Sequence, residues 1–281
     1  MDSLLFTKLF RGESLETVAE STRQLGFDGV DLLIRRGHQV EPDAPELILD
    51  AVRRLQTEGL TVPMATTDIT DPVLHTPERI FATCAEAGIG QIRLGYWKYD
   101  PGTRYVAGVD AARRDLDGLA KVAARADVKI VVQLHGGTLH GSGVQTAALL
   151  EGHDPAVVGA YPDPGNQVVQ DGREDWRLTF DVLSPWLSCV GVKNGGWFPG
   201  ELYPSGQRHW RSDWFGLPDG MVPWDDIIDH LITSGYDGPL SFHSHYEVPF
   251  AQVLEQTGLD LKFIRRQLAA HATTELERAT V

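Results

Sequence analysis

The chain has 281 residues, of which 42% are hydrophobic, and its formal net charge is -14. This length and hydrophobic content suit one α/β barrel of about 250 residues, while the acidic balance argues against a nucleic-acid partner. There is no apolar run that reaches the roughly 18 residues of a membrane span, no leader-like N-terminus and no CxxC pair, so we expect a cytoplasmic protein without a disulfide framework.

Apolar runs typical of buried strands alternate with apolar stripes of helical spacing along the whole chain. Strands are expected at residues 4–10, 27–33, 60–66, 90–96, 130–135, 156–161, 187–192 and 239–245, and helices at 15–25, 45–58, 77–87, 114–125, 146–150, 176–183, 224–234 and 252–269. Eight such alternations without a break in composition predict a single (β/α)8 TIM barrel over residues 1–281. A doubly wound sheet would need a glycine-rich nucleotide turn after its first strand, and the sequence has none there.

The segment of residues 195–220 interrupts this rhythm, because it is too long for an ordinary connection between a strand and a helix. It is rich in Gly, Pro and aromatic residues, and it includes Trp197. Clustered aromatic residues on a loop usually bury against something, such as a substrate or another subunit. We therefore expect a long loop that covers the substrate or contacts a second copy in a homo-oligomer; packing on the barrel rim is the alternative.

Residues 130–137, IVVQLHGG, change from apolar to polar just before a Gly-Gly pair. Side chains alternate between the two faces of a strand, so Val131, Gln133 and His135 share one face. The carboxyl ends of the strands carry the active site in a closed parallel barrel. The two polar side chains are candidates for chemistry, and a Gln and a His that satisfy each other in the core are the alternative.

Polar residues also fall at the expected carboxyl ends of other strands. They are Asp31, Arg93, Asp163, Asn166, Lys193, Asn194, His243 and His245. Each alone is more often structural than functional, but their convergence on one rim predicts an active site. Two chemistries fit: His and carboxylate ligands suit Mn, Zn, Fe or Co beside a sugar carbonyl, and a His or a desolvated Lys193 can move a proton without a metal.

Four phrases carry a resemblance to a known family. They are LGFDGVD at 25–31, the segment from VG to DPGN at 158–166, VGVKN at 190–194, and VPW followed by GYDGPL within 222–240. Together and in this order they resemble the xylose isomerase-like TIM barrels, which include sugar-phosphate isomerases and epimerases, inosose dehydratases and endonuclease IV. The resemblance covers nearly the whole chain and implies a barrel that acts on a carbohydrate.

The resemblance also implies a metal site from which this chain departs. Family members usually bind one divalent metal through Glu, Asp, His and Glu from the fifth to the eighth strand. The matching positions hold Gln133, Asp163, Gly191 and His243, so only the aspartate is retained. Two alternatives stay open: a reshaped metal site of Gln133, His135, Asp163 and His243, or a metal-free pocket.

We expect an isomerase or epimerase of a sugar or keto-sugar that works through an enediol-like intermediate. His135 or His243 would transfer the proton, and Lys193 or a metal would stabilise the oxyanion. The substrate would also contact Asp31, Arg93, Asn166, Asn194, Trp197 and His245. Dehydration of a keto-sugar or polyol, which begins with the same proton abstraction, is one alternative, and a non-catalytic sugar-binding barrel or enzyme subunit is another.

Overall fold

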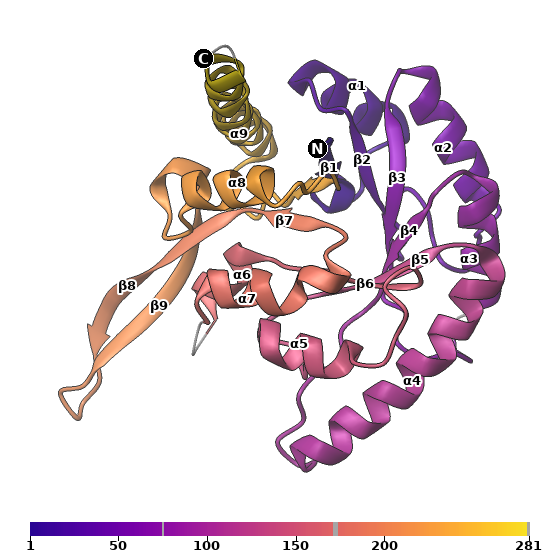
Figure 1. Cartoon of the computed structure of the whole chain (residues 1–281), viewed down its shortest axis with the longest axis horizontal. Coiled ribbons are helices and arrows are strands. Elements are labelled where there is room, and N and C mark those ends of the chain that lie inside the picture. The colour runs from indigo at the N-terminus through magenta and orange to yellow at the C-terminus, as the bar shows by residue number, and fades with distance from the viewer. Residues whose placement is uncertain (75, 171–173, 280–281) are drawn as a thin grey trace.

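The computed structural model describes residues 1–74, 76–170 and 174–279, and of residues 272–279 it describes the backbone alone. Eight parallel strands form one sheet in the order β6-β5-β4-β3-β2-β1-β10-β7. They are β1 (Ser3–Phe6), β2 (Gly29–Leu33), β3 (Thr61–Thr66), β4 (Gln91–Arg93), β5 (Lys129–Gln133), β6 (Val158–Tyr161), β7 (Val190–Val192) and β10 (Leu240–Phe242). The sheet curls into a barrel around which the helices are arranged (Figure 1).

Backbone contacts between β6 and β7 close most of the remaining gap in the sheet. Leu187, just before β7, bridges to Ala160, and the amide of Ser188 donates to the Ala160 carbonyl at 3.0 Å. The amide of Gly191 donates to the Pro162 carbonyl at 2.9 Å. The predicted (β/α)8 barrel is therefore confirmed.

Helices follow the strands along the chain. They are α1 (Leu15–Leu25), α2 (Leu47–Thr57), α3 (Pro77–Glu86), α4 (Tyr105–Ala126), α5 (Gly143–Leu150), α6 (Pro164–Val169), α7 (Trp176–Leu183), α8 (Trp224–Thr233) and α9 (Phe250–Ala279), with short 3-10 turns η1 (Thr7–Phe10), η2 (Ser184–Trp186) and η3 (Leu217–Asp219). In α1 the Ser14 side chain caps the first turn, and Gly26 ends the helix with a φ of 88°, a value that glycine adopts without strain. Within the described ranges, every helix is too short or too polar to cross a membrane.

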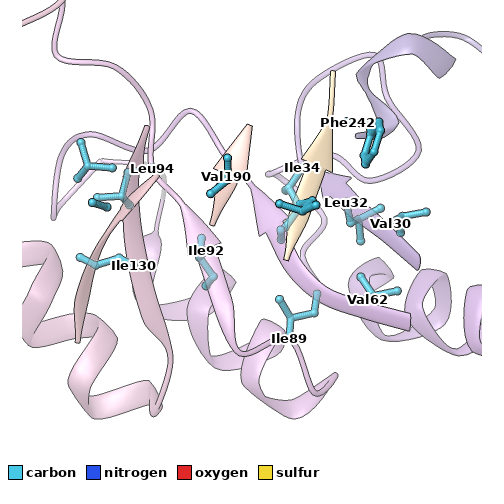
Figure 2. Close-up of a cluster of buried hydrophobic side chains, with 14 of the residues drawn as sticks. Val30, Leu32, Ile34, Val62, Ile89, Ile92, Leu94, Ile130, Val190 and Phe242 are labelled. Atoms are coloured by element: carbon cyan, nitrogen blue, oxygen red, sulfur yellow. The ribbon is translucent and has the colours of Figure 1, made fainter. Parts of the chain in front are cut away.

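The core has two layers because side chains alternate along each strand. Most buried aliphatic residues lie between the strands and the helices, and Figure 2 shows part of this layer, with Ile130 of β5 among its members. Leu4, Met64, Val131, Tyr161 and Cys189 form a separate cluster. On β5 the residues therefore alternate between the two layers as predicted, which places Gln133 on the same face as Val131.

Several strands end earlier than the sequence predicts. β5 ends at Gln133 and β10 at Phe242, so His135 and His243 lie just beyond the strands. Backbone pairing extends one residue further, since the amide of Leu134 donates to Tyr161 and that of His243 to Val192. Both histidines therefore lie at the carboxyl end of the barrel.

The aromatic segment folds as a β-hairpin rather than as an irregular loop. Its strands β8 (Asn194–Leu202) and β9 (Arg208–Phe215) are antiparallel, and they project away from the barrel (Figure 1). Gly195 pairs with Trp214 and Trp197 pairs with Ser212, so the two tryptophans share one face of the hairpin. The indole N–H of Trp197 donates to the Val168 carbonyl at 2.6 Å, which ties the base of the hairpin to α6.

Candidate active site

A cavity of about 250 Å³ opens at the carboxyl ends of the strands. It is lined by Phe6, Lys8, Arg35, Arg93, Tyr96, His135, Asn166, Lys193, Trp214, His243 and His245. The structure thus brings together six of the predicted site residues: Arg93, His135, Asn166, Lys193, His243 and His245. Two others, Gln133 and Asp163, contact this lining directly through hydrogen bonds and an ion pair.

A buried ion pair lies at the centre of this site. The Lys193 ammonium is 3.0 Å from Oδ2 of Asp163, and the side chains are 4% and 0% exposed. Gln133 donates to the same oxygen at 2.6 Å, and the other carboxylate oxygen accepts the backbone N–H of Asn166 at 2.8 Å. Burial lowers the pKa of Lys193, and the carboxylate opposes that shift by stabilising the ammonium form.

The amide of Gln133 links this pair to a buried guanidinium. Its oxygen accepts hydrogen bonds from Arg93 at 3.0 Å and from the Tyr96 hydroxyl at 2.6 Å, while its nitrogen donates to Asp163. Arg93 is 2% exposed and also donates to Thr66 and to the carbonyl of Thr67. The orientation of the amide is fixed by these partners, because only its oxygen can accept from Arg93.

The hydrogen bond of His135 fits one neutral tautomer of its ring. Its Nδ1 is 2.8 Å from the carbonyl oxygen of Gly136, and because a carbonyl only accepts, the ring proton is on Nδ1 and the lone pair on Nε2. Burial lowers the pKa of His135, and the nearby Lys193 charge lowers it further. The ring lies 4.3 Å from that of Tyr96, which fixes its orientation at the cavity wall.

His243 is a second neutral imidazole on another side of the cavity. Its Nε2 is 2.8 Å from the Tyr161 hydroxyl, and its ring stacks on Phe6 at 4.5 Å. Burial lowers the pKa of His243 well below its usual value, with Lys193 adding to the shift. Around the rim the order is His135 after β5, Asp163 after β6, Lys193 after β7 and His243 after β10, so the ion pair lies between the two histidines.

Three predicted residues lie outside this cavity. Asp31 is fully buried and accepts from Thr66 at 2.8 Å and Ser241 at 2.9 Å; burial raises its pKa to about 6. The amide of Asn194 bonds to backbone groups of Gly195, Leu217 and Val222, so it holds the base of the hairpin in place. Trp197 lines an adjoining, larger hollow.

Positive charge dominates the lining of the cavity. The lining includes four cationic side chains: Lys8, Arg35, Arg93 and Lys193. Two of them are paired with a carboxylate, Lys193 with Asp163 and Arg35 with Asp68. Partial desolvation lowers the pKa of Lys8, and so do the charges of Arg35, Lys193 and Arg93. In a chain of net charge -14, this concentration of cations suits the stabilisation of an oxyanion.

Sequence reasoning missed Lys8, Arg35 and Tyr96. Each lies two or three residues beyond the end of its strand, on β1, β2 and β4 respectively. Lys8 lies inside the expected strand at 4–10, which is longer than β1, so its position at a carboxyl end is not visible from the sequence. Tyr96 is the last residue of the expected strand at 90–96 and Arg35 lies two residues beyond that at 27–33, so the rule that barrel sites form at the carboxyl ends of strands could have found both.

The residues present do not fit a divalent metal. Within the described residues no three His, Cys, Asp or Glu side chains are grouped as metal ligands. Gly191 is the residue at the third ligand position that the resemblance implies, and it has no side chain to bind a metal. A Cβ added there would lie 2.8 Å from Oδ2 of Asp163, so the carboxylate packs directly against the backbone of Gly191. The Lys193 ammonium occupies that same oxygen and would repel a second cation.

Barrel and rim together define a (β/α)8 barrel with a polar cavity at the carboxyl ends of its strands, and comparison with known proteins places it in a family. The model of the xylose isomerase-like TIM barrel matches residues 19–267, so the chain belongs to that family. No curated protein matches the sequence.

Solved structures share the fold at low sequence identity. A xylose isomerase-like TIM barrel protein from Mycobacterium smegmatis, in complex with magnesium, is 17% identical with a TM-score of 0.71, covering 95% of this chain and 97% of that one. D-psicose 3-epimerase with D-tagatose, from Clostridium cellulolyticum H10, is 12% identical with a TM-score of 0.68, covering 95% and 99%. The probable 3-DHS dehydratase AsbF from Bacillus anthracis is 17% identical with a TM-score of 0.65, covering 92% and 97%. These likenesses extend over more than nine-tenths of the chain and show the barrel fold.

Proposed function

We propose that the protein is an enzyme that moves a proton on the carbon next to the carbonyl of a sugar or keto-sugar, and so isomerises or epimerises it. The observation that carries this proposal is the hydrogen bond between Nδ1 of His135 and the Gly136 carbonyl. It leaves the Nε2 lone pair of His135 free to accept a proton, and His135 lines the cavity that also contains four Lys and Arg side chains. A neutral imidazole beside buried cations is suited to remove a proton whose loss creates negative charge.

The reaction begins when Nε2 of His135 takes the proton from the carbon next to the carbonyl. The electron pair of that C–H bond moves to the carbonyl oxygen, which becomes an enediolate oxyanion. Lys193 and Arg93 supply positive charge there, and the Tyr96 hydroxyl is a further donor in the lining. Because the ion pair and Gln133 hold these groups before substrate binds, little reorganisation is needed as the charge develops.

Return of the proton decides the product. Delivery to the former carbonyl carbon gives an isomer, because the second hydroxyl of the enediol passes its proton to the first oxygen and becomes the new carbonyl. Delivery to the opposite face of the original carbon restores the first carbonyl and gives an epimer. His243 follows β10, three strands away from His135 around the rim, and its bond to the Tyr161 hydroxyl on β6 fixes its ring, which suits His243 to deliver a proton from another direction.

Dehydration of a keto-sugar or polyol is the second candidate, because elimination starts from the same enediolate. It would need a proton donor for the departing hydroxyl, and His243 of the cavity lining, held by the buried Tyr161 hydroxyl, offers one. The structural likeness to a probable dehydratase supports keeping this alternative.

Deuterium exchange tests the shared first step. The protein is incubated in D2O with D-tagatose and a panel of other keto-sugars, and NMR follows deuterium at the carbon next to the carbonyl. We expect exchange with at least one sugar, and loss of about a hundredfold or more in His135→Gln, the usual scale for a general base. The exposed His209 on the hairpin provides the matched control, His209→Gln.

Three results separate the candidates. A new sugar isomer in the spectrum supports isomerisation or epimerisation, and loss of water from the sugar supports dehydration. Absence of exchange across the panel, together with measurable sugar binding, would favour a non-catalytic sugar-binding barrel.

A further inference from the structure

A second and larger hollow, of about 590 Å³, adjoins the cavity. The two share His135, Asn166 and Trp214, so the larger hollow lies directly beside the proposed reacting group His135. Its walls come from the connection after β5, from α5 and α6, and from the base of the hairpin. A ligand held at His135 can therefore extend directly into it.

The larger hollow differs from the cavity in its chemistry. Among the described residues that line it, only His135 has an ionisable side chain, whereas the cavity contains four Lys and Arg residues. Its polar groups are neutral and include the hydroxyl of Ser142 and the amides of Gln145 and Gln170. Bare backbone at Gly136 and Gly137 adds further hydrogen-bonding groups. This lining suits an uncharged ligand rich in hydroxyl groups.

Two indole rings give the larger hollow an apolar wall. Trp197 and Trp214 share one face of the hairpin, and the bond from Trp197 to the Val168 carbonyl fixes the position of the first ring. Trp214 contacts the reaction cavity as well, since its ring lies 4.9 Å from the Lys193 ammonium and 5.3 Å from the ring of His245. Rigid aromatic faces of this kind bury the C–H face of a pyranose while leaving its hydroxyls free to bond.

We propose that this hollow is a subsite for a second, uncharged sugar ring, so that the substrate is a keto-sugar glycoside of at least two rings. This inference rests on the proposed reaction, which fixes the end of the substrate that is held at His135. The cavity alone is smaller than the roughly 300 Å³ at which ordinary small-molecule sites begin, and the adjoining hollow supplies the missing space.

The test measures binding without turnover, by calorimetric titration of the full chain. The probes are sucrose, cellobiose and maltose, with their component rings D-glucose and D-fructose. We expect at least one disaccharide to bind ten times or more tightly than either of its rings. If the protein shows this preference but exchanges no proton, the subsite is supported and the proposed reaction is wrong. Failure of the subsite and failure of the proposed reaction can therefore be told apart.

Two variants address the hollow itself. Trp197→Ala removes an indole face, and Gln145→Trp fills the space from α5 without removing a side-chain hydrogen bond of the described residues. Both should abolish the tenfold preference, and Gln145→Trp should leave single-ring binding unchanged, while Trp210→Ala, 55% exposed on the hairpin, should preserve the preference. Disaccharides that bind no more tightly than single rings, or a Gln145→Trp variant that weakens both equally, would overturn the proposal.

Discussion

Lys193 and Asp163 form an ion pair of 3.0 Å in which both side chains are almost completely buried. The resemblance implies that Asp163 is the one retained member of the usual set of metal ligands. The cation beside that carboxylate is supplied by the chain itself. A lysine whose ammonium group is held in place in this way can stabilise an oxyanion at the cavity.

Replacement of Lys193 by Met should destabilise the protein by about 3–5 kcal/mol, the usual cost of leaving one member of a buried pair without its partner. The cost arises because Asp163 would remain charged, buried and without its cation. Denaturant unfolding measures the change in the free energy of unfolding. The double variant Lys193→Met with Asp163→Asn should recover most of the lost stability, because the uncompensated charge is removed. An equal loss of unfolding free energy in the single and the double variant would contradict this account.

Gly191→Ala should disturb the site without altering its charges. The added Cβ would lie 2.8 Å from Oδ2 and 2.9 Å from Cγ of Asp163, so the carboxylate that pairs with Lys193 must shift to make room. We expect a cost of about 1–3 kcal/mol from overpacking, together with a loss of proton exchange. In the control Gly90→Ala the new methyl meets nothing within 4 Å, and this variant should match the unmodified chain in both measurements. Wild-type exchange in Gly191→Ala would show that the position of Asp163 is unimportant.

The fold could be predicted because each part of the barrel leaves a local trace in the sequence. Buried parallel strands are apolar runs, helices have a 3.6-residue stripe, and eight repeats of this pair suit one topology. Gln133, Asp163, Lys193 and His243 could be named for a related reason: the carboxyl ends of parallel strands meet at one rim, wherever they lie in the chain.

The remaining parts depend on contacts that no local pattern records. Asn194 follows β7 like a site residue, yet its amide bonds to Leu217 and Val222, which are 23 and 28 residues away. The hairpin could not be predicted because Gly195, Gly196 and Pro199 in β8 weaken the alternation of apolar and polar residues that is typical of a strand. The tautomer of His135 follows from one backbone carbonyl, a geometry that only coordinates reveal.

Removal of divalent metals should leave the proposed proton exchange unchanged. The physical reason is that Lys193 holds the Asp163 oxygen on which a metal would bind, and Gly191 offers no side-chain ligand. The exchange rate is measured after treatment with EDTA and again after addition of Mn²⁺, with metal content determined by elemental analysis. Exchange that stops with EDTA and returns with one equivalent of Mn²⁺ would mean that His and Asp rebuild a metal site and that Lys193 moves away on binding.

The pH dependence of proton exchange should follow the titration of His135. A general base must be neutral, and burial lowers the pKa of this imidazole below its usual 6.5, so the neutral form persists into more acidic solution. The acid limb of the rate should therefore lie below pH 6.5, with full activity above it. The NMR titration of the His135 ring should give the same midpoint as the rate. In His135→Gln the residual exchange should lose this limb, and an unchanged limb in that variant would assign the base to another group, with His243 next to be tested.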